Sequence, residues 1–407
     1  MRMTRTRMTI VALCFVLSCS GYAGQIVLDR PQDVGMSPEK LAQVSPAVQD
    51  LVDAEKIAGA SVVVARRGKV VFFETFGVMD KEAGKPVAED TIFRFYSMTK
   101  PVTSVAVMML VEQGKIKLDD PVSKYIEPFK NLKVYDESGT PVEATREVTV
   151  RDLLRHTSGL TYGYFGNTAV DKMYRNRGVL DREASLQDMA AKLGEIPLLY
   201  QPGTKWHYGV STDVLGYLVE KVSGESLDAF FRNRIFGPLG MKDTGFHVPP
   251  EKVDRFAVCY SPMPGQGLTI SDDPRKSQFL QKPGLLSGGG GLVSTIGDYL
   301  QFCRVLANKG ELDGKRLLRT ETVEMMTRNQ LPESVSWMGQ GFGLGFSVWL
   351  TENKYGAGEY GWGGAASTHF WIHPKHELIV IALLQLMPYS NQLADAVRPR
   401  VYEAIVE

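Results

Sequence analysis

The sequence has few cysteines and no excess of charge of either sign. Of its 407 residues only four are cysteine, and 46 Lys and Arg balance 46 Asp and Glu, so the formal net charge is zero. Two cysteines fall within the first 20 residues, which leaves Cys259 and Cys303, too few for a zinc site or a cysteine-based catalytic site. No run of Lys and Arg supplies the concentrated positive field that nucleic-acid binding needs. These absences argue against a zinc-cluster protein and against a nucleic-acid partner.

A long apolar run is also missing, except at the N-terminus. Three arginines there precede an apolar stretch at about residues 8–17, and small residues follow it. The stretch is too short to cross a bilayer, so residues 1–23 are predicted to be a signal peptide that is cleaved after Ala23. A buried N-terminal helix and lipid attachment at Cys19 stay open as alternatives. We therefore expect a periplasmic or secreted protein whose mature part has no transmembrane span.

The two remaining cysteines are interpreted as free thiols. An exported protein could pair Cys259 with Cys303, because disulfides persist in oxidising compartments. Cys303, however, falls in a predicted helix at residues 296–308, where a buried thiol behaves as a small apolar side chain. The sequence therefore favours free cysteines and leaves a disulfide as the alternative.

Length and hydrophobic pattern indicate an α/β protein with two regions. The chain exceeds the size at which a single hydrophobic core usually stops growing. Strands are expected at residues 60–65, 70–76, 342–350, 367–372 and 378–384. Helices are expected from Ser37 to Leu51, from Ser97 to Gly114, and at 150–156, 185–193, 211–222, 226–235, 292–308 and 391–406. Residues 25–115 and 290–407 would then build one sheet-containing domain, into which a mostly helical domain of residues 116–289 is inserted.

The strongest chemical signal is a serine followed three residues later by a lysine at a predicted helix start. Ser97 and Lys100 would lie on one helix face, where a desolvated lysine can accept the proton of a serine nucleophile. The helix N-terminus adds N–H donors where an oxyanion would form. Ser37 and Lys40 repeat the spacing, but Pro38 suits a helix cap, and Lys40 would face solvent. The apolar residues around Ser97 predict that its polar pair is buried, and taken alone this leaves catalysis and a cap with a salt bridge as equal alternatives.

Two further segments carry residues that fit the same chemistry. Tyr208 lies on a predicted loop after residues 202–204, where its hydroxyl could relay a proton beside a lysine. Alone, such a tyrosine more often fills a domain interface. Residues 361–368 place small side chains ahead of a β-forming strand, so a substrate could lie against the strand edge. Alone, that segment is a β-bulge or a turn.

Together these elements resemble the serine β-lactamases and penicillin-binding proteins. Ser97-x-x-Lys100, the Tyr208 loop and the Trp362-Gly363-Gly364 strand follow in the order and approximate spacing of that superfamily, and the whole is class C β-lactamase-like. Residues 153–160 and 288–295 are also similar to it. The resemblance implies a β-lactamase/transpeptidase-like three-layer α/β/α sandwich with a mainly antiparallel sheet. An inserted, mostly helical domain would complete the active site between the two.

The resemblance also implies roles for particular residues. Ser97 would be the nucleophile, with Lys100 and Tyr208 as the general base and acid. The backbone N–H groups of Ser97 and Ala365 would form the oxyanion hole. The strand residues Trp362, Gly363 and Gly364 would bind the substrate.

The sequence departs from the β-lactamase pattern at two places. Val210 stands where asparagine is usual, and Trp362-Gly363-Gly364 replaces Lys-Thr-Gly on the strand. The lost lysine is a lost positive charge for a β-lactam or peptide carboxylate. The Trp-Gly-Gly variant is similar to that of the family VIII carboxylesterases, which implies weak or absent β-lactamase activity.

We therefore expect an exported serine hydrolase, a carboxylesterase that forms an acyl-enzyme with small or short-chain esters and needs no cofactor or metal. A β-lactamase or a D-amino-acid peptidase or amidase is the nearest alternative. A non-catalytic cell-wall peptide-binding protein on the same fold is a further one. The lack of a Gly-x-Ser-x-Gly segment argues against an ordinary α/β-hydrolase.

The histidines are interpreted as structural or as substrate-lining. His369, His373 and His376 are close in sequence, and strand alternation would place the first two on one face. A turn follows them and no carboxylate is obviously placed to complete a metal site, so metal binding is disfavoured. His156 and His207 flank the expected active-site loops, but neither is expected to act as a triad base.

Overall fold

A computed structural model gives the structure of residues 26–136, 138–351 and 355–406. The predicted signal peptide and Cys19 lie outside these residues. The central sheet has eight strands in the order β12-β13-β14-β15-β16-β1-β2-β3, and every neighbouring pair is antiparallel. The strands are β1 (Gly59–Arg66), β2 (Lys69–Asp80), β3 (Lys85–Pro86), β12 (Gly341–Phe342), β13 (Ser347–Val348), β14 (Tyr360–Gly364), β15 (Thr368–His373) and β16 (Leu378–Leu384).

Both ends of the chain contribute to this sheet. The predicted hairpin is β1 and β2, in which alternating apolar and β-branched residues pair across a turn at Arg67 and Gly68. Strand β1 also pairs with β16, so that Ala60 lies opposite Leu384. This confirms the prediction of one antiparallel sheet assembled from the two ends of the chain.

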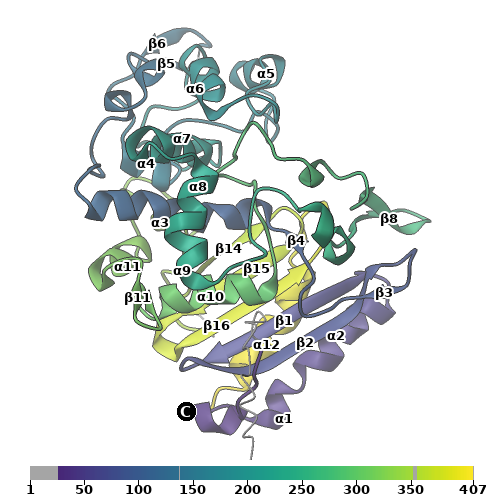
Figure 1. Cartoon of the computed structure of the whole chain (residues 1–407). Coiled ribbons are helices and arrows are strands. Elements are labelled where there is room, and N and C mark those ends of the chain that lie inside the picture. Colours follow the sequence, from purple (N-terminus) through teal and green to yellow (C-terminus); the bar gives the residue numbers. More distant parts are fainter. Residues whose placement is uncertain (1–25, 137, 352–354, 407) are drawn as a thin grey trace, which may run out of the picture.

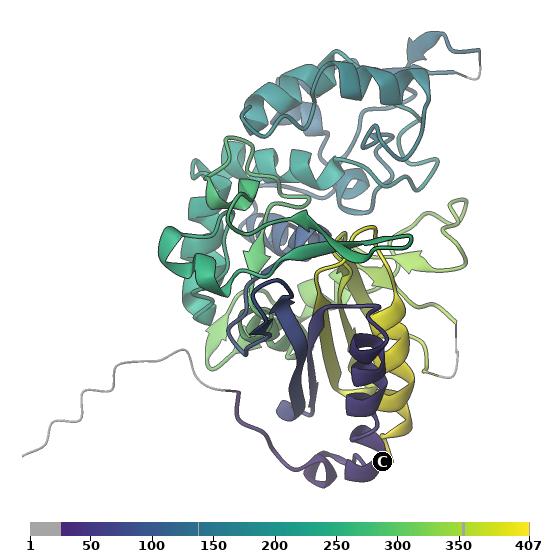
Figure 2. The same cartoon turned by 90° about the vertical axis from the view of Figure 1, so that its right-hand side faces the viewer.

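Helices cover both faces of the sheet. On one face α2 (Val44–Asp53) and α12 (Gln392–Glu403) lie side by side and contact β2 and β16 (Figure 2). On the other face α10 (Ile296–Ala307) packs against β1, β15 and β16 (Figure 1). Every residue of β1 and of β16 is buried, because these central strands are covered on both sides. The three-layer sandwich expected from the sequence is therefore confirmed.

The chain between β3 and α10 contains more helix than strand and lies above the sheet in Figure 1. Its helices are α3 (Thr99–Glu112), α4 (Val150–Leu154), α5 (Ala169–Asn176), α6 (Leu186–Gly194), α7 (Ser211–Ser223), α8 (Leu227–Phe231) and α9 (Gly237–Leu239). Its short strands are β4 (Phe93–Arg94), β5 (Lys133–Tyr135), β6 (Pro141–Glu143), β7 (Cys259–Met263), β8 (Gly267–Asp272) and β9 (Val293–Ser294). Beyond it lie β10 (Glu311–Leu312), β11 (Lys315–Arg316) and α11 (Thr320–Met326). We propose residues 116–289 as the boundaries of the helical domain.

Two of the predicted elements are interrupted. The strand expected at residues 342–350 is the separate strands β12 and β13, because Gly345 adopts a φ of +98° where a Cβ would lie 2.2 Å from Ser104 Oγ of α3. The helix expected from Ser37 to Leu51 is α1 (Pro38–Leu41) followed by α2. Pro46 has no amide hydrogen for the carbonyl of Ala42, so one continuous helix cannot form there.

Two smaller expectations, the cap at Ser37 and the free thiols, are borne out in the described residues. Ser37 caps α1, since its Oγ accepts a hydrogen bond from the amide of Lys40 at 3.3 Å, and Lys40 is exposed. Cys259 and Cys303 are free and buried, as favoured above. Within the same residues, no helix combines the length and the apolar character that crossing a bilayer requires.

A buried carboxylate, Asp152, holds the segment that follows α4. Its side chain pairs with Arg146 at 2.5 Å and Arg155 at 3.0 Å, and it accepts hydrogen bonds from the hydroxyls of Thr149 and Thr157. Burial alone would raise the pKa of Asp152, but the hydrogen bonds from Arg146 and Thr149 outweigh it and lower the pKa to about 2. The ion pairs therefore fix the loop at residues 155–162, which reaches the active site.

Replacing Asp152 with asparagine is expected to destabilise the protein by about 3 kcal/mol, because the variant leaves two arginines without their buried partner. Urea unfolding at pH 7 measures the change. Asp119→Asn is the matched control, since Asp119 pairs with Arg151 but its side chain is 74% exposed. That variant is expected to change the free energy of unfolding by less than about 1 kcal/mol. Equal losses in the two variants would contradict the special role of Asp152.

Candidate active site

Ser97 lies in a single 3₁₀ turn at residues 96–98 that leads directly into α3. The preceding residue, Tyr96, has a φ of +42°, a left-handed conformation that costs energy for any residue except glycine. Ser97 is half-buried, whereas Lys100, one turn further along, is 1% exposed. The amine of Lys100 therefore lies in the interior, and the hydroxyl of Ser97 lies nearer the surface.

Lys100 and Tyr208 both bind the hydroxyl of Ser97. Lys100 Nζ donates to Ser97 Oγ at 3.2 Å, and Tyr208 Oη donates to the same oxygen at 2.8 Å. The ammonium group also lies 4.6 Å from the centre of the Tyr208 ring. The structure thus brings the three predicted residues together from two segments more than 100 residues apart, within the distances that proton transfer requires.

Lys100 has two more acceptors, to which the sequence analysis assigned no individual role. Nζ donates to Tyr162 Oη at 2.8 Å and to the carbonyl of Gly289 at 2.6 Å. Burial raises the pKa of Tyr162 well above 10, so its hydroxyl stays protonated. Tyr162 lies two residues after the segment 153–160, which resembles the superfamily, and it is in a stretch rich in aromatic residues. This proximity is the only feature of the sequence that points to Tyr162.

The loop of Tyr208 is fixed by the segment that follows α4. The amide of His207 donates to the carbonyl of His156 at 2.8 Å, and the hydroxyls of Ser158 and Ser211 lie 2.8 Å apart. The ring centre of His156 lies 4.9 Å from that of Tyr208. Burial lowers the pKa of His156 well below 6.5, so the ring is neutral at physiological pH. His156 thus supports Tyr208 by packing, in keeping with its structural interpretation.

The end of β14 approaches the turn that carries Ser97. A Cβ on Gly364 would lie 2.2 Å from the carbonyl oxygen of Phe95 and 2.3 Å from Thr368 Oγ1, so only glycine permits this approach. Ala365 is the next residue and begins the turn between β14 and β15. This packing agrees with the prediction that the N–H groups of Ser97 and Ala365 form the oxyanion hole, which stays a prediction.

Aromatic side chains line the approach to Ser97. Trp206, Trp337, Phe342 and Trp362 form what we call the aromatic wall, in which ring centres of Trp206 and Trp337 lie 4.4 Å apart and those of Phe342 and Trp362 lie 5.3 Å apart. Trp362 contacts the ring of Tyr208 at 5.6 Å between centres. The predicted substrate-binding residue Trp362 therefore lies beside the proposed catalytic residues and presents an apolar face to them.

A second aromatic group borders Tyr208. Phe165 lies 6.1 Å from Tyr208 between ring centres, and Tyr164 stacks on Tyr162 at 5.4 Å. These two side chains are 67% and 58% exposed and are therefore accessible from solvent. The surroundings of Ser97 therefore favour an apolar group over a charged one.

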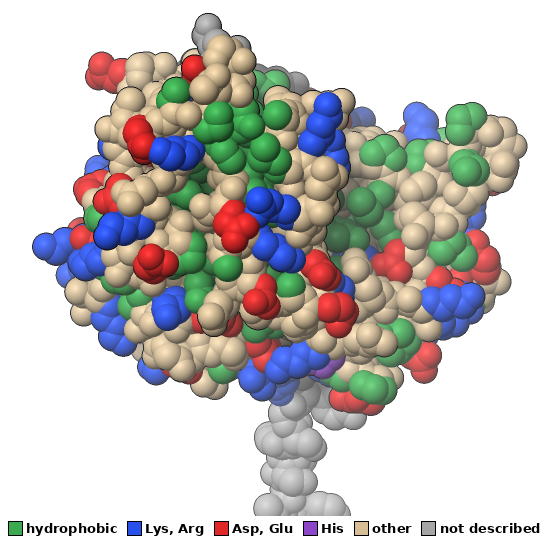
Figure 3. Space-filling view, turned by 90° about the horizontal axis from the view of Figure 1, so that it is seen from above, with side chains coloured by type: hydrophobic (Ala, Val, Ile, Leu, Met, Phe, Trp, Pro, Cys, Tyr) green, Lys and Arg blue, Asp and Glu red, His purple; other side chains and the backbone are tan. Residues whose placement is uncertain are grey.

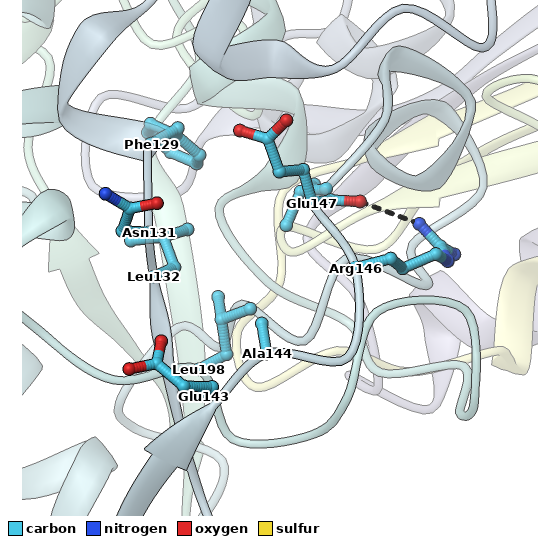
Figure 4. Close-up of a pocket in the computed structure, with 9 residues that line it drawn as sticks. Phe129, Asn131, Leu132, Glu143, Ala144, Arg146, Glu147 and Leu198 are labelled. Carbon is cyan, nitrogen blue, oxygen red and sulfur yellow. Dashed lines mark hydrogen bonds between the residues drawn. The ribbon is translucent and has the colours of Figure 1, made fainter.

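The face seen from the helical end shows no continuous area of one charge. Seen from the helical end, positive, negative and apolar side chains alternate over the face of the molecule (Figure 3). A cavity of about 160 Å³ is lined by Phe129, Asn131, Leu132, Glu143, Ala144, Arg146, Glu147, Val148 and Leu198. Figure 4 shows Arg146 turned away from the other lining residues, with a hydrogen bond to the carbonyl of Glu147. The cavity shares no residue with the surroundings of Ser97.

The three crowded histidines do not meet at one point. His369 contacts Tyr389 and the carbonyl of Ser390, whereas His373 lies against His376, with ring centres 4.3 Å apart. Among the described residues, no group of three or more His, Cys, Asp or Glu side chains is arranged to hold a metal ion.

Buried histidines predict a loss of stability in acid. Burial lowers the pKa of His369 and of His373 from 6.5 to about 4, so between these values the unfolded chain binds more protons than the folded one. The free energy of unfolding should therefore fall as the pH drops from 6.5 towards 4. For His369 alone the full loss is about 3 kcal/mol. Asp298, whose pKa is raised to about 6 by burial, acts in the opposite direction between 3.8 and 6.

Urea unfolding at a series of pH values measures this dependence. In a His369→Gln variant, which cannot be protonated at that position, we expect a flatter decline between pH 6.5 and 4. An identical slope in the variant and the parent would show that His369 does not contribute.

The sheet covered by helices and the hydrogen-bonded Ser97, Lys100 and Tyr208 define a serine hydrolase related to the β-lactamases and penicillin-binding proteins. The sequence profile of the family described as Beta-lactamase matches residues 44–402, and the chain belongs to that family. The resemblance and the fold class predicted from the sequence are thereby confirmed.

Similar proteins differ in the reactions that their names state. Esterase EstB of Burkholderia gladioli is 31% identical over 404 residues, which cover 91% of this chain and 98% of EstB. The structure of EstCE1, a hydrolase with promiscuous acyltransferase activity, matches with a TM-score of 0.77 at 28% identity, over 89% of this chain and 99% of that one. A Salmonella enteritidis protein with the provisional name D-alanyl-D-alanine carboxypeptidase is 26% identical over 436 residues, 97% of this chain and 95% of that protein.

Proposed function

We propose that the protein is an exported carboxylesterase that acts on small or short-chain esters through an acyl-enzyme on Ser97. The observation that carries the proposal is the neighbourhood of the Ser97 hydroxyl. Lys100 and Tyr208 bind this hydroxyl, and Trp362 lies beside Tyr208 at the strand position where the β-lactamase pattern has lysine. A neutral ester can bind the aromatic wall without losing an ion pair, whereas a β-lactam carboxylate would find no lysine there.

The reaction follows from these contacts. Ser97 Oγ attacks the ester carbonyl carbon once the Lys100–Tyr208 pair has released one proton, so that the deprotonated oxygen of Tyr208, beside the ammonium group of Lys100, accepts the proton of the Ser97 hydroxyl. The same pair returns a proton to the departing alcohol, which leaves an acyl group on Ser97. Water then attacks the acyl-enzyme, and the carboxylic acid is released as Ser97 regains its proton. The oxyanion of each tetrahedral intermediate would accept hydrogen bonds from the amides of Ser97 and Ala365.

Relatives support the proposal in part. EstB is named an esterase and EstCE1 a hydrolase with acyltransferase activity, so ester chemistry occurs on similar chains. The provisional name of the Salmonella protein keeps amide hydrolysis as the alternative. Export rests on the predicted signal peptide alone, and we retain a periplasmic or secreted location as a proposal.

Initial rates on neutral esters and on amides test the function. The protein without residues 1–23 is assayed with p-nitrophenyl acetate and butyrate, with nitrocefin, and with a peptide that ends in D-Ala-D-Ala. We expect kcat/KM for the esters to exceed that for nitrocefin by at least about 100-fold, equivalent to the loss of one charge-assisted contact. Only turnover that disappears in Ser97→Ala is counted.

Faster cleavage of nitrocefin than of the esters would place the protein among the β-lactamases. Release of D-alanine as the main reaction would make it a peptidase. Binding of the peptide without turnover of any substrate would favour the cell-wall peptide-binding alternative.

A further inference from the structure

A buried carboxylate behind the active site has no part in the reaction described above. Asp213 lies in the first turn of α7, which packs against α3 (Figure 1), and its side chain is 0% exposed. Its Oδ1 accepts hydrogen bonds from Ser287 Oγ at 2.5 Å and from the amide of Gly289 at 3.0 Å. Its Oδ2 is buried and has no hydrogen-bond partner among the described residues. A carboxylate with an unsatisfied oxygen in the interior is costly unless a positive charge lies near it.

The nearby positive charge is Lys100, and Gly289 connects the two. The carbonyl of Gly289 accepts the hydrogen bond from Lys100 Nζ at 2.6 Å, while the amide of the same residue donates to Asp213. A Cβ on Gly289 would lie 2.4 Å from Asp213 Oδ2, so the contact requires glycine at this position. The chain of contacts therefore runs from Asp213 through Gly289 and Lys100 to Ser97 Oγ.

The chemistry of the surrounding groups favours the ionised pair. A protonated Oδ2 would have no acceptor for its hydrogen, because no partner contacts this atom. Burial raises the pKa of Asp213 above 3.8, and the charge of Lys100 and the hydrogen bonds from Ser287 and Gly289 oppose that rise. All three contacts of Lys100 Nζ are to oxygen acceptors, which suits an ammonium group with three hydrogens. Lys100 and Asp213 are both buried, so neither charge is screened by water.

We propose that Asp213 is a positioning residue, the buried counter-charge that holds the ammonium group of Lys100 against Ser97 by way of Gly289. The role that it gives to Lys100 rests on the proposed function, but the pairing of the two charges does not. Asp213 touches no reacting atom. It accepts a hydrogen bond from the Gly289 amide, which orients the carbonyl that binds Lys100, and it supplies a buried negative charge near the amine.

A double-mutant cycle on stability tests the pairing without any substrate. Asp213→Asn keeps the shape and the Oδ1 acceptor but leaves Lys100 as an uncompensated buried charge, and Lys100→Met leaves Asp213 in the same condition. The double variant has neither charge. We expect it to lose at least about 3 °C less in melting temperature than the sum of the two single variants. If Asp213→Asn does not fold and the double variant does, the pairing is supported as well.

Asp298→Asn provides the matched control cycle. Asp298 is also a buried carboxylate, 8% exposed, but it lies on α10 and accepts hydrogen bonds from the amide of Asp243 and the hydroxyl of Thr244. Its melting-temperature loss should add to that of Lys100→Met. Additive losses in the Asp213 cycle as well would overturn the proposal.

The pH dependence of kcat/KM for p-nitrophenyl acetate separates a positioning role from a merely structural one. The titratable groups that face Asp213 and Lys100 are Tyr162 and Tyr164 after α4, Tyr208 before α7, and His156. The charge of Asp213 is among the causes that raise the pKa of Tyr162 and of Tyr164, so its removal lowers the pKa of both groups. At least one limb of the profile should therefore move to lower pH by about one unit in Asp213→Asn, with kcat/KM lowered about 10- to 100-fold.

Each outcome of the kinetic test decides one question. A lower rate with both limbs unmoved would mean that Asp213 acts only on the fold, and would overturn the proposal. Asp298→Asn should leave both limbs in place. A parent protein that hydrolyses no ester would refute the proposed function, whereas the stability cycle would still decide whether Asp213 pairs with Lys100.

Discussion

Replacing Ser97 with alanine is expected to lower kcat/KM for p-nitrophenyl butyrate by at least about 10⁴-fold. The variant keeps the Cβ and removes only the oxygen that Lys100 and Tyr208 bind at 3.2 and 2.8 Å. Intact-mass spectra after rapid quenching should show the parent protein with one added butyryl group and the variant without it. The melting temperature should change by less than about 3 °C, because the site is half-buried and no packing is lost.

Ser37→Ala is the matched control, since Ser37 precedes Lys40 at the same spacing as Ser97 precedes Lys100. Ser37 caps α1 with an oxygen that accepts from the amide of Lys40. Its loss should cost about 1 kcal/mol of stability and leave turnover unchanged. Turnover that survives in Ser97→Ala, or disappears in Ser37→Ala, would show that the nucleophile is misassigned.

A Tyr208→Phe variant is expected to lose about 10²- to 10⁴-fold in kcat, the range that a general acid or base contributes. Phenylalanine keeps the ring that packs against His156 and Trp362, and removes only the hydroxyl that donates to Ser97. Stopped-flow measurement of p-nitrophenol release separates acylation from deacylation. Because the hydroxyl serves both half-reactions, both rates should fall.

Tyr162→Phe removes the same hydroxyl group from a tyrosine that contacts Lys100 instead of Ser97. Tyr162 accepts from Lys100 but has no hydrogen bond to Ser97. We expect its loss to lower kcat by less than about 10-fold, the effect of one supporting hydrogen bond. A larger loss in Tyr162→Phe than in Tyr208→Phe would assign proton transfer to Tyr162.

The residues that the sequence identified are those with a local reason for their position. Ser97 and Lys100 are one helical turn apart, so their proximity follows from helix geometry alone. The hairpin of β1 and β2 was visible because alternating apolar residues and the glycine turn are contiguous. The substrate-binding position of Trp362 was predicted from the strand that contains it and from the resemblance to a known family.

Other residues acquire their role only through contacts between distant segments. Asp213 lies five residues after Tyr208, but the amide that it binds belongs to Gly289, 76 residues further along the chain. The four glycines at 288–291 belong to a segment that resembles the superfamily. The need for glycine there comes from close contacts with distant parts of the chain. A Cβ on Gly288 would lie 2.7 Å from the carbonyl of Thr212, and one on Gly289 would meet Asp213. No periodicity within either segment encodes such approaches.

The same limit explains the wrong strand at residues 342–350. Its apolar and aromatic residues have high β-propensity, which favours one long strand. The chain turns at Gly345, which has a φ of +98° and packs so closely against Ser104 of α3, more than 200 residues earlier, that a Cβ would lie 2.2 Å from Ser104 Oγ. Tertiary packing therefore overrides the local preference.

The pairing of β1 with β16 also sets the order in which the protein can fold. Ala60 cannot pair with Leu384 until nearly the entire chain has left the ribosome. One edge of the hairpin of β1 and β2 therefore stays unpaired throughout synthesis. Slow closure of this kind invites chaperone binding and aggregation at 37 °C. For a chain that we propose is exported, the delay has a use, because translocation through a narrow channel requires a polypeptide that has not yet collapsed into its final shape.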